Sequence, residues 1–129
     1  MVVAMREVIE ISGVSHGTAP IPMGAKIGNI VYSSAIMGKI PGEKHLPQDP
    51  ERQITQLFLN IHSFMKKAGG TSGHIIQMSV YLKDNSLREL FNQEWVRMFP
   101  DPRDRPARHI TIVDLRNGMQ AQVEIVAVL

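Results

Sequence analysis

Residues 49–82 read DPERQITQLFLNIHSFMKKAGGTSGHIIQMSVYL, and this stretch decides the fold. Its first part repeats apolar residues at the i, i+3, i+4, i+7 spacing of a helix, which we predict over residues 50–68. Asp49 suits the N-cap of this helix, Pro50 its first position, and Gly69 its end. The helix leads directly into an alternating apolar segment, so a helix packed on a sheet is indicated.

Alternation and turn residues locate the other elements. The remaining predictions are strands over residues 7–11, 74–82, 107–113 and 121–128, two short strands within residues 25–37, and a second helix over residues 87–99. Within the strand over 74–82, the apolar face is Ile76, Met78, Val80 and Leu82. Ser86 and Glu89 match a capping box for the second helix. The turn residues Asn117 and Gly118 predict a hairpin between the last two strands.

This order predicts an α+β fold in which one mixed β-sheet carries two helices on one face. The predicted last strand bears on the assembly of the protein, because both of its faces carry apolar residues. One face can pack against the helices, whereas the other presents Val126 and Val128 to solvent unless another subunit covers them. The sequence therefore predicts a homo-oligomer.

The composition is that of one globular domain over residues 1–129. The chain is 43% hydrophobic and 20% charged, with a formal net charge of +2. Its lack of cysteine excludes disulfides, thiolate metal sites and a cysteine nucleophile, and its histidines form no metal-binding motif. The mixed charges and sparse aromatic residues do not favour a nucleic-acid partner. No signal peptide or membrane span is indicated, so a cytoplasmic location is expected.

Arg108 is the residue that calls for a chemical explanation, because it opens an apolar row with Ile110 and Ile112. A charge at the start of such a strand costs free energy unless it is paired. One interpretation is a cross-strand ion pair with Glu124 in the predicted hairpin. The other is a guanidinium that binds a substrate carboxylate, with Glu124 as a nearby acid or base.

The chain also resembles a known family, the Rid family, also called the YjgF or liver perchloric-acid-soluble protein family. The segments that carry the resemblance are IGNIVYSSAI (27–36), AGGTSGHIIQMSVYLKD (68–84), NQEW (92–95), RPAR (105–108) and VEIVAV (123–128). RPAR alone is a weak motif, but this set in this order is fairly specific. The segments span nearly the whole chain.

The resemblance implies a chorismate-mutase-like fold and a homotrimer whose sheets form a central barrel, with clefts between the subunits. It implies that Arg108 binds the substrate carboxylate and that Glu124 positions or activates water. It also assigns Asn92 and Ser34 to the substrate site. Ile110, where the family usually has a cysteine, would act through its backbone. No metal or organic cofactor is implied.

Some positions depart from the family pattern. Ile21 stands where the family usually has a tyrosine, and Ala35 and Ile36 replace a glycine and a glutamine. His16, five residues before Ile21, is a candidate for the vacated polar role. Because these positions differ, the chain is similar to a side branch of the family, whose range of substrates and catalytic activity can differ from those of the best-known members.

The expected function is that of an enamine/imine deaminase, similar to the 2-iminobutanoate and 2-iminopropanoate deaminases. Such a hydrolase converts reactive amino-acid-derived imines to 2-keto acids and ammonia. One alternative is a non-catalytic regulatory trimer that binds small carboxylates in the same clefts. A third possibility, less favoured by the charge pattern, is an endoribonuclease or translation inhibitor.

Overall fold

The computed structural model describes residues 5–129; residues 1–4, part of the N-terminal stretch considered for a signal peptide, lie outside the described residues. Its elements in chain order are β1 (Glu7–Ile9), β2 (Gly24–Ile27), β3 (Ile30–Ser33), β4 (Ile36–Met37), α1 (Pro50–Ala68), β5 (Ile75–Leu82), α2 (Arg88–Met98), β6 (Ala107–Ile112) and β7 (Ala121–Val128). Short 3₁₀ turns, Ser72–His74 and Asn85–Leu87, precede β5 and α2. No helix among residues 5–129 has the length and apolar character needed to cross a membrane.

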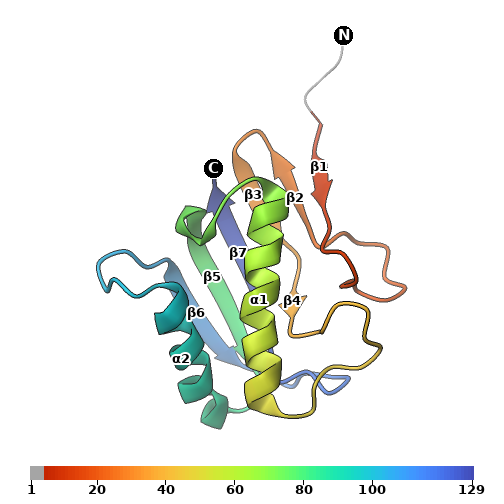
Figure 1. Cartoon of the computed structure of the whole chain (residues 1–129), viewed down its shortest axis with the longest axis vertical. Coiled ribbons are helices and arrows are strands. Elements are labelled where there is room, and N and C mark those ends of the chain that lie inside the picture. The colour runs from red at the N-terminus through yellow and green to blue at the C-terminus, as the bar shows by residue number, and fades with distance from the viewer. Residues whose placement is uncertain (1–4) are drawn as a thin grey trace.

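One mixed sheet forms a layer behind the two helices (Figure 1). Its strand order is β1-β2-β3-β7-β5-β6, and β4 pairs with the part of β7 that β3 leaves free. Only β5 and β6 are parallel neighbours, joined through α2. The predicted α+β architecture, with two helices on one face of a mixed sheet, is confirmed.

The predicted hairpin of the last two strands is wrong. Residues Asn117 and Gly118 do turn, with φ angles of 61° and 77°, but the strands that they connect are not neighbours. β5 lies between β6 and β7, parallel to the first and antiparallel to the second. A turn signal is local, whereas β5 offers β6 and β7 two hydrogen-bonding edges on which both can pair.

Helix α1 has its predicted bounds and caps. The Asp49 side chain accepts a hydrogen bond from the N–H of Arg52 (3.3 Å), and Gly69 ends the helix with a φ of 94°. The predicted capping box of α2 is wrong. Asp84 instead accepts from the N–H of Ser86 (2.8 Å) and caps the 3₁₀ turn, so α2 begins later, after Leu87.

A register shift in β5 changes which of its first residues is buried. The shift falls between Ile75 and Gln77, so Ile75 lies in the core and Ile76 is 53% exposed. Sequence alternation had placed Ile76 on the buried face with Met78. Met78, Val80 and Leu82 are buried as predicted.

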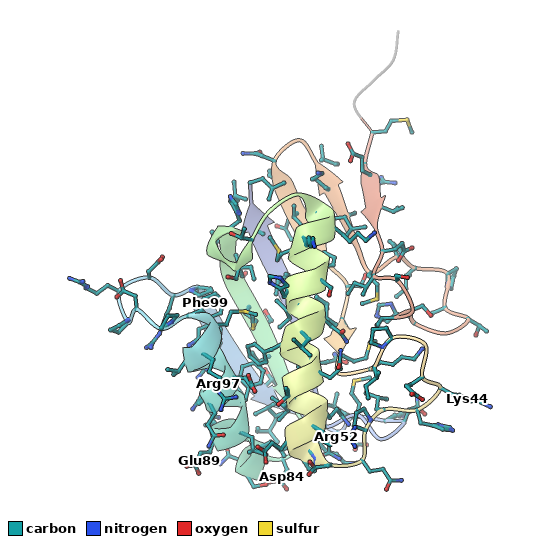
Figure 2. The ribbon with its side chains drawn as sticks, viewed as in Figure 1. Lys44, Arg52, Asp84, Glu89, Arg97 and Phe99 are labelled. Atoms are coloured by element: carbon teal, nitrogen blue, oxygen red, sulfur yellow. The ribbon has the colours of Figure 1, made fainter. Side chains whose placement is uncertain are left out.

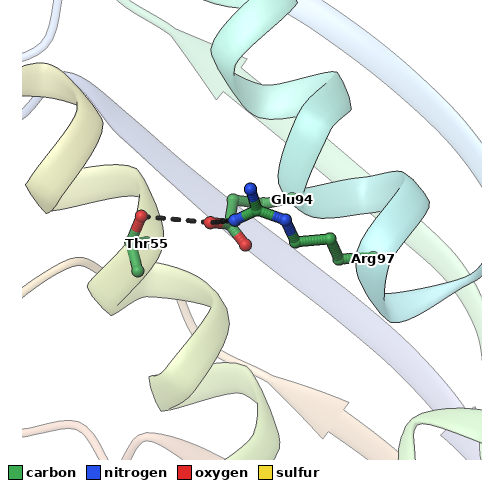
Figure 3. A network of polar contacts seen from close by, with 3 residues as sticks. All are labelled: Thr55, Glu94 and Arg97. Atoms are coloured by element: carbon green, nitrogen blue, oxygen red, sulfur yellow. Dashed lines mark hydrogen bonds and ion pairs between the residues drawn. The ribbon is translucent and has the colours of Figure 1, made fainter.

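One side-chain hydrogen bond joins the two helices, and a second, within α2, shares its carboxylate. Glu94 of α2 accepts hydrogen bonds from the hydroxyl of Thr55 on α1 and from Nη1 of Arg97, both at 3.0 Å (Figure 3). The carboxylate of Glu94 therefore connects the two helices and also occupies the Arg97 guanidinium. The buried rings of Phe58 on α1 and Phe91 on α2, with centroids 5.0 Å apart, pack the same two helices together in the core.

Gln53 is a buried side chain that attaches two loops to α1. Its Nε2 donates to the carbonyls of Pro47 (2.8 Å) and Gly118 (3.0 Å), and its Oε1 accepts from the N–H of Gln120 (2.6 Å). Only 1% of Gln53 is exposed, whereas Pro47 and Gln120 are partly buried and Gly118 is exposed. The polar atoms of the buried Gln53 amide therefore depend on these three backbone groups for their hydrogen bonds.

We predict that Gln53→Ala lowers the free energy of unfolding by about 3 kcal/mol, because three hydrogen bonds of a buried side chain are lost, each contributing about 1 kcal/mol. Urea unfolding at matched protein concentration measures the change. The control is Gln93→Ala on the exposed surface of α2, which should change stability by less than about 0.5 kcal/mol. Equal effects of the two variants would contradict the role assigned to Gln53.

Candidate functional site

Arg108 lies on the edge strand β6, and its side chain packs against α2. In the sheet register Arg108 pairs with Met78, whose other neighbour is Ile125, and both of these residues are buried under the helices. Because paired residues share a face, Arg108 points to the helix-covered side. Its Nη1 donates to Oδ1 of Asn92 on α2 at 2.8 Å.

Two aromatic rings of α2 also contact this guanidinium. The Arg108 guanidinium carbon lies 4.7 Å from the ring centroid of Trp95 and 5.8 Å from that of Phe91. Cation–π attraction and the Asn92 hydrogen bond thus hold the guanidinium in one orientation. Sequence reasoning did not identify Trp95 as a site residue, although its spacing of three residues from Asn92 indicates that both share a helix face.

Arg108 has no carboxylate partner among residues 5–129, where no acidic side chain lies within 4.0 Å of its guanidinium nitrogens. Partial burial, and then the positive charge of Arg88, lower the pKa of Arg108, although a guanidinium stays protonated at neutral pH. A half-buried cation without a counter-ion is favourably placed to bind an anion.

Glu124 lies on the opposite face of the sheet. It pairs with Ser79 of β5, which pairs on its other side with His109, so Glu124 shares a face with His109 rather than with Arg108. The predicted cross-strand pair of Arg108 and Glu124 is therefore wrong, because β5 separates the strands and sheet alternation turns the two side chains apart.

The exposed Glu124 carboxylate instead accepts a hydrogen bond from the hydroxyl of Tyr81, at 3.1 Å from Oε1. This hydrogen bond is the largest cause that raises the pKa of Tyr81 above its ordinary value of 10.0. The negative charge of Glu124 and the slight burial of Tyr81 raise it further. Sequence reasoning did not identify Tyr81, although its alternation with Val80 placed it on the face away from the core.

Ser34 and Ala35 form a bulge beside Glu124. Tyr32 pairs with Val126 and Ile36 with Val123, so residues 33–35 lie opposite only Ile125 and Glu124. The Ser33 hydroxyl accepts from the N–H of Ile125 (2.8 Å), where strand pairing is interrupted. The N–H of Ser34 donates to the carbonyl of Met23 (2.7 Å), which leaves its hydroxyl as its available polar group.

His16 supports this bulge. Its Nε2 lies 2.7 Å from the carbonyl oxygen of Ala35, and because a carbonyl only accepts, Nε2 is the donor. The other ring nitrogen, Nδ1, is buried without a hydrogen-bond partner among the described residues. Ile21, which is 51% exposed, lines a cavity of about 580 Å³ together with His16.

The candidate residues therefore form two separate groups. We call Arg108, Asn92 and Trp95 the arginine half-site, and Glu124, Tyr81, Ser34 and His16 the glutamate half-site. Ile110 follows Arg108 along β6 on the helix-facing side, where it packs against the core. Among residues 5–129 no cluster of three or more potential metal ligands is present.

Arg105, the first residue of the RPAR segment, makes no ion pair with Asp101 or Asp104 of its own loop. Its Nε donates to the carbonyl of Phe99 (2.9 Å). Phe99 lies at the C-terminal end of α2 (Figure 2). Arg103, rather than Arg105, lies 3.7 Å from Asp101. A helix end exposes unpaired carbonyls, so Arg105 acts there as a C-terminal cap.

Comparisons with known proteins agree with this fold. The family model described as Endoribonuclease L-PSP matches residues 18–129. A RutC family protein of Haemophilus influenzae is 25% identical over 96% of the chain and 98% of its own length. The putative reactive intermediate deaminase TdcF of Escherichia coli is 23% identical, with the same coverage. The crystal structure of RidA from an Antarctic Psychrobacter bacterium superimposes with a TM-score of 0.86 and 26% identity, covering 95% of this chain and 99% of that one.

We predict that the Glu124→Gln substitution lowers the pKa of Tyr81 toward 10.0, because the carboxylate that favours the protonated phenol is removed. Spectrophotometric titration of phenolate absorbance measures this pKa. The chain has two tyrosines, so both measurements use a Tyr32→Phe background, which leaves Tyr81 as the only titrating phenol. An unchanged pKa would contradict the Tyr81–Glu124 contact.

Proposed function

Because the chain belongs to the Endoribonuclease L-PSP family, we propose that it is an enamine/imine deaminase, which hydrolyses reactive amino-acid-derived imines to 2-keto acids and ammonia. The observation that carries the proposal is the half-buried Arg108 guanidinium, oriented by Asn92 and without a carboxylate among the described residues. A 2-imino acid supplies such a carboxylate next to its reactive carbon. The names of relatives described as reactive intermediate deaminases, at 23–24% identity, support this reaction class.

We further propose that each site forms between two copies of the chain. Arg108 and Glu124 point to opposite faces of one sheet, so a site that uses both needs them from different subunits. The face that carries Glu124 also leaves Ile30 49%, Tyr32 59% and Val128 38% exposed, which supports its burial against other copies. A homotrimer whose sheets form a central barrel would cover this face.

In the proposed reaction, Arg108 holds the substrate carboxylate through paired hydrogen bonds and fixes the position of the C=N bond. Glu124 of the neighbouring subunit takes a proton from water as the oxygen attacks the imine carbon. The nitrogen takes up the proton held by Glu124 and then the remaining proton of the added hydroxyl, so that the C–N bond breaks and ammonia leaves as the carbonyl forms. Outward backbone groups of edge strand β6 near Ile110 and the hydroxyl of Ser34 are candidates to hydrogen-bond the reacting atoms.

A second candidate is a non-catalytic trimer that binds small carboxylates. Ile21 presents an apolar side chain where relatives usually carry a tyrosine, and His16 does not replace that group freely, because its Nε2 is engaged by the Ala35 carbonyl. Ile36 is buried in the core, so it adds no polar group either. These features favour a site with fewer polar contacts to the reacting nitrogen.

We predict that Arg108→Ala lowers kcat/KM by about 100-fold or more for 2-iminopropanoate and 2-iminobutanoate, because orientation by the charged clamp is lost. Ammonia release from freshly generated imine measures the rate. Arg103→Ala, at an exposed loop position, is the matched control and should retain wild-type activity. Wild-type rates equal to those in buffer would exclude deamination, and binding of 2-keto acids without turnover would favour the second candidate.

A mixing experiment tests the shared site. Arg108→Ala and Glu124→Gln should each be nearly inactive alone, whereas trimers reassembled from equal amounts of both should recover about one quarter of wild-type activity. In that fraction of interfaces, an intact arginine meets an intact glutamate from its neighbour. A site contained within one chain would recover no activity, and that result would overturn the proposed arrangement.

A further inference from the structure

Arg88 lies on the same side of α2 as the residues that hold Arg108. Arg88, Asn92 and Trp95 are spaced i, i+4 and i+7, which places them along one helix face. Asn92 and Trp95 both contact the Arg108 guanidinium. Arg88 stands one turn nearer the helix N-terminus, about 6 Å along the axis from Asn92.

Arg88 is a second cation without a carboxylate partner in the described part of the chain. It is exposed, and its Nε donates to Oδ1 of Asn85 at 3.1 Å, so its terminal nitrogens stay free for another group. The Asp84 carboxylate accepts from the N–H of Ser86, and the Glu94 carboxylate accepts from Thr55 and Arg97. Neither Asp84, Glu94 nor the adjacent Glu89 forms an ion pair with Arg88. Burial is the larger cause that lowers the pKa of Arg108, and the positive charge of Arg88 is the second cause.

The strand opposite supplies an apolar strip that runs toward Arg88. α2 starts after the end of β5 and runs back along β6, so its N-terminal end lies near the C-terminal end of β6 (Figure 1). Ile110 and Ile112 follow Arg108 on the helix-facing side of β6, and Ile112 is 45% exposed. The exposed Ile112 therefore lies on the helix-facing side of β6, at the end of the strand nearest the N-terminal end of α2.

We propose that the arginine half-site binds dianions, with one carboxylate on Arg108 and a second acidic group on Arg88. Two like charges on one side of α2 repel each other, and a dianion would neutralise both. Dianion binding rests on the proposed deaminase function and narrows its substrates to imines of acidic amino acids. The products of these imines are four- or five-carbon 2-keto diacids.

The test compares a keto diacid with a keto monoacid by isothermal titration calorimetry on the full chain. Wild type should bind 2-oxoglutarate about 10-fold or more tightly than 2-oxobutanoate, the ratio expected for one additional charge-assisted contact. Arg88→Gln should abolish this preference while the Kd for 2-oxobutanoate stays within about twofold. The control, Arg97→Gln on the same helix, should keep the preference, because Arg97 is paired with Glu94.

The outcomes separate this inference from the deaminase proposal. Wild-type turnover of 2-iminopropanoate together with equal binding of both keto acids would overturn the dianion inference alone. A preference that depends on Arg88 but comes without turnover of any imine would support dianion binding and overturn the deaminase. Loss of affinity for both keto acids in Arg88→Gln, or no binding of either by wild type, would also overturn the inference.

Discussion

The position of β5 between β6 and β7 is the constraint on which the candidate site depends. Each strand pair shares side-chain direction through its register, so Met78 directs Arg108 toward the helices and Ser79 directs Glu124 away from them. The two charged groups cannot neutralise each other within the chain. Both consequently remain available, one half-buried against α2 and the other on the uncovered sheet face.

Helix α2 turns an isolated cation into a defined binding group. Asn92 accepts from the guanidinium of Arg108 and the Trp95 ring lies against it, while Glu94 on another side of the same helix connects α2 to α1. The buried amide of Gln53 holds the loops before and after this layer. The orientation of Arg108 thus rests on α2, which packs against α1 through buried aromatic residues and the Thr55–Glu94 hydrogen bond.

Sequence reasoning succeeded where local physics dominates. The period of apolar residues and the caps at Asp49 and Gly69 predicted α1 at its observed bounds, since helix hydrogen bonds connect residues four apart. It was wrong where a local signal competes with pairing partners elsewhere. The turn at Asn117 and Gly118 did not make a hairpin, and the shift in β5 exposed Ile76.

By itself, the sequence determined the secondary-structure elements, the two-layer class, the uncovered apolar sheet face and the identity of the charged residues, because these follow from periodicity and composition. Only the tertiary structure decided which side chains meet. Strand order and register are settled by packing of the whole core, and these place Asn92, Trp95 and Arg88 beside Arg108 while sending Glu124 to the opposite face.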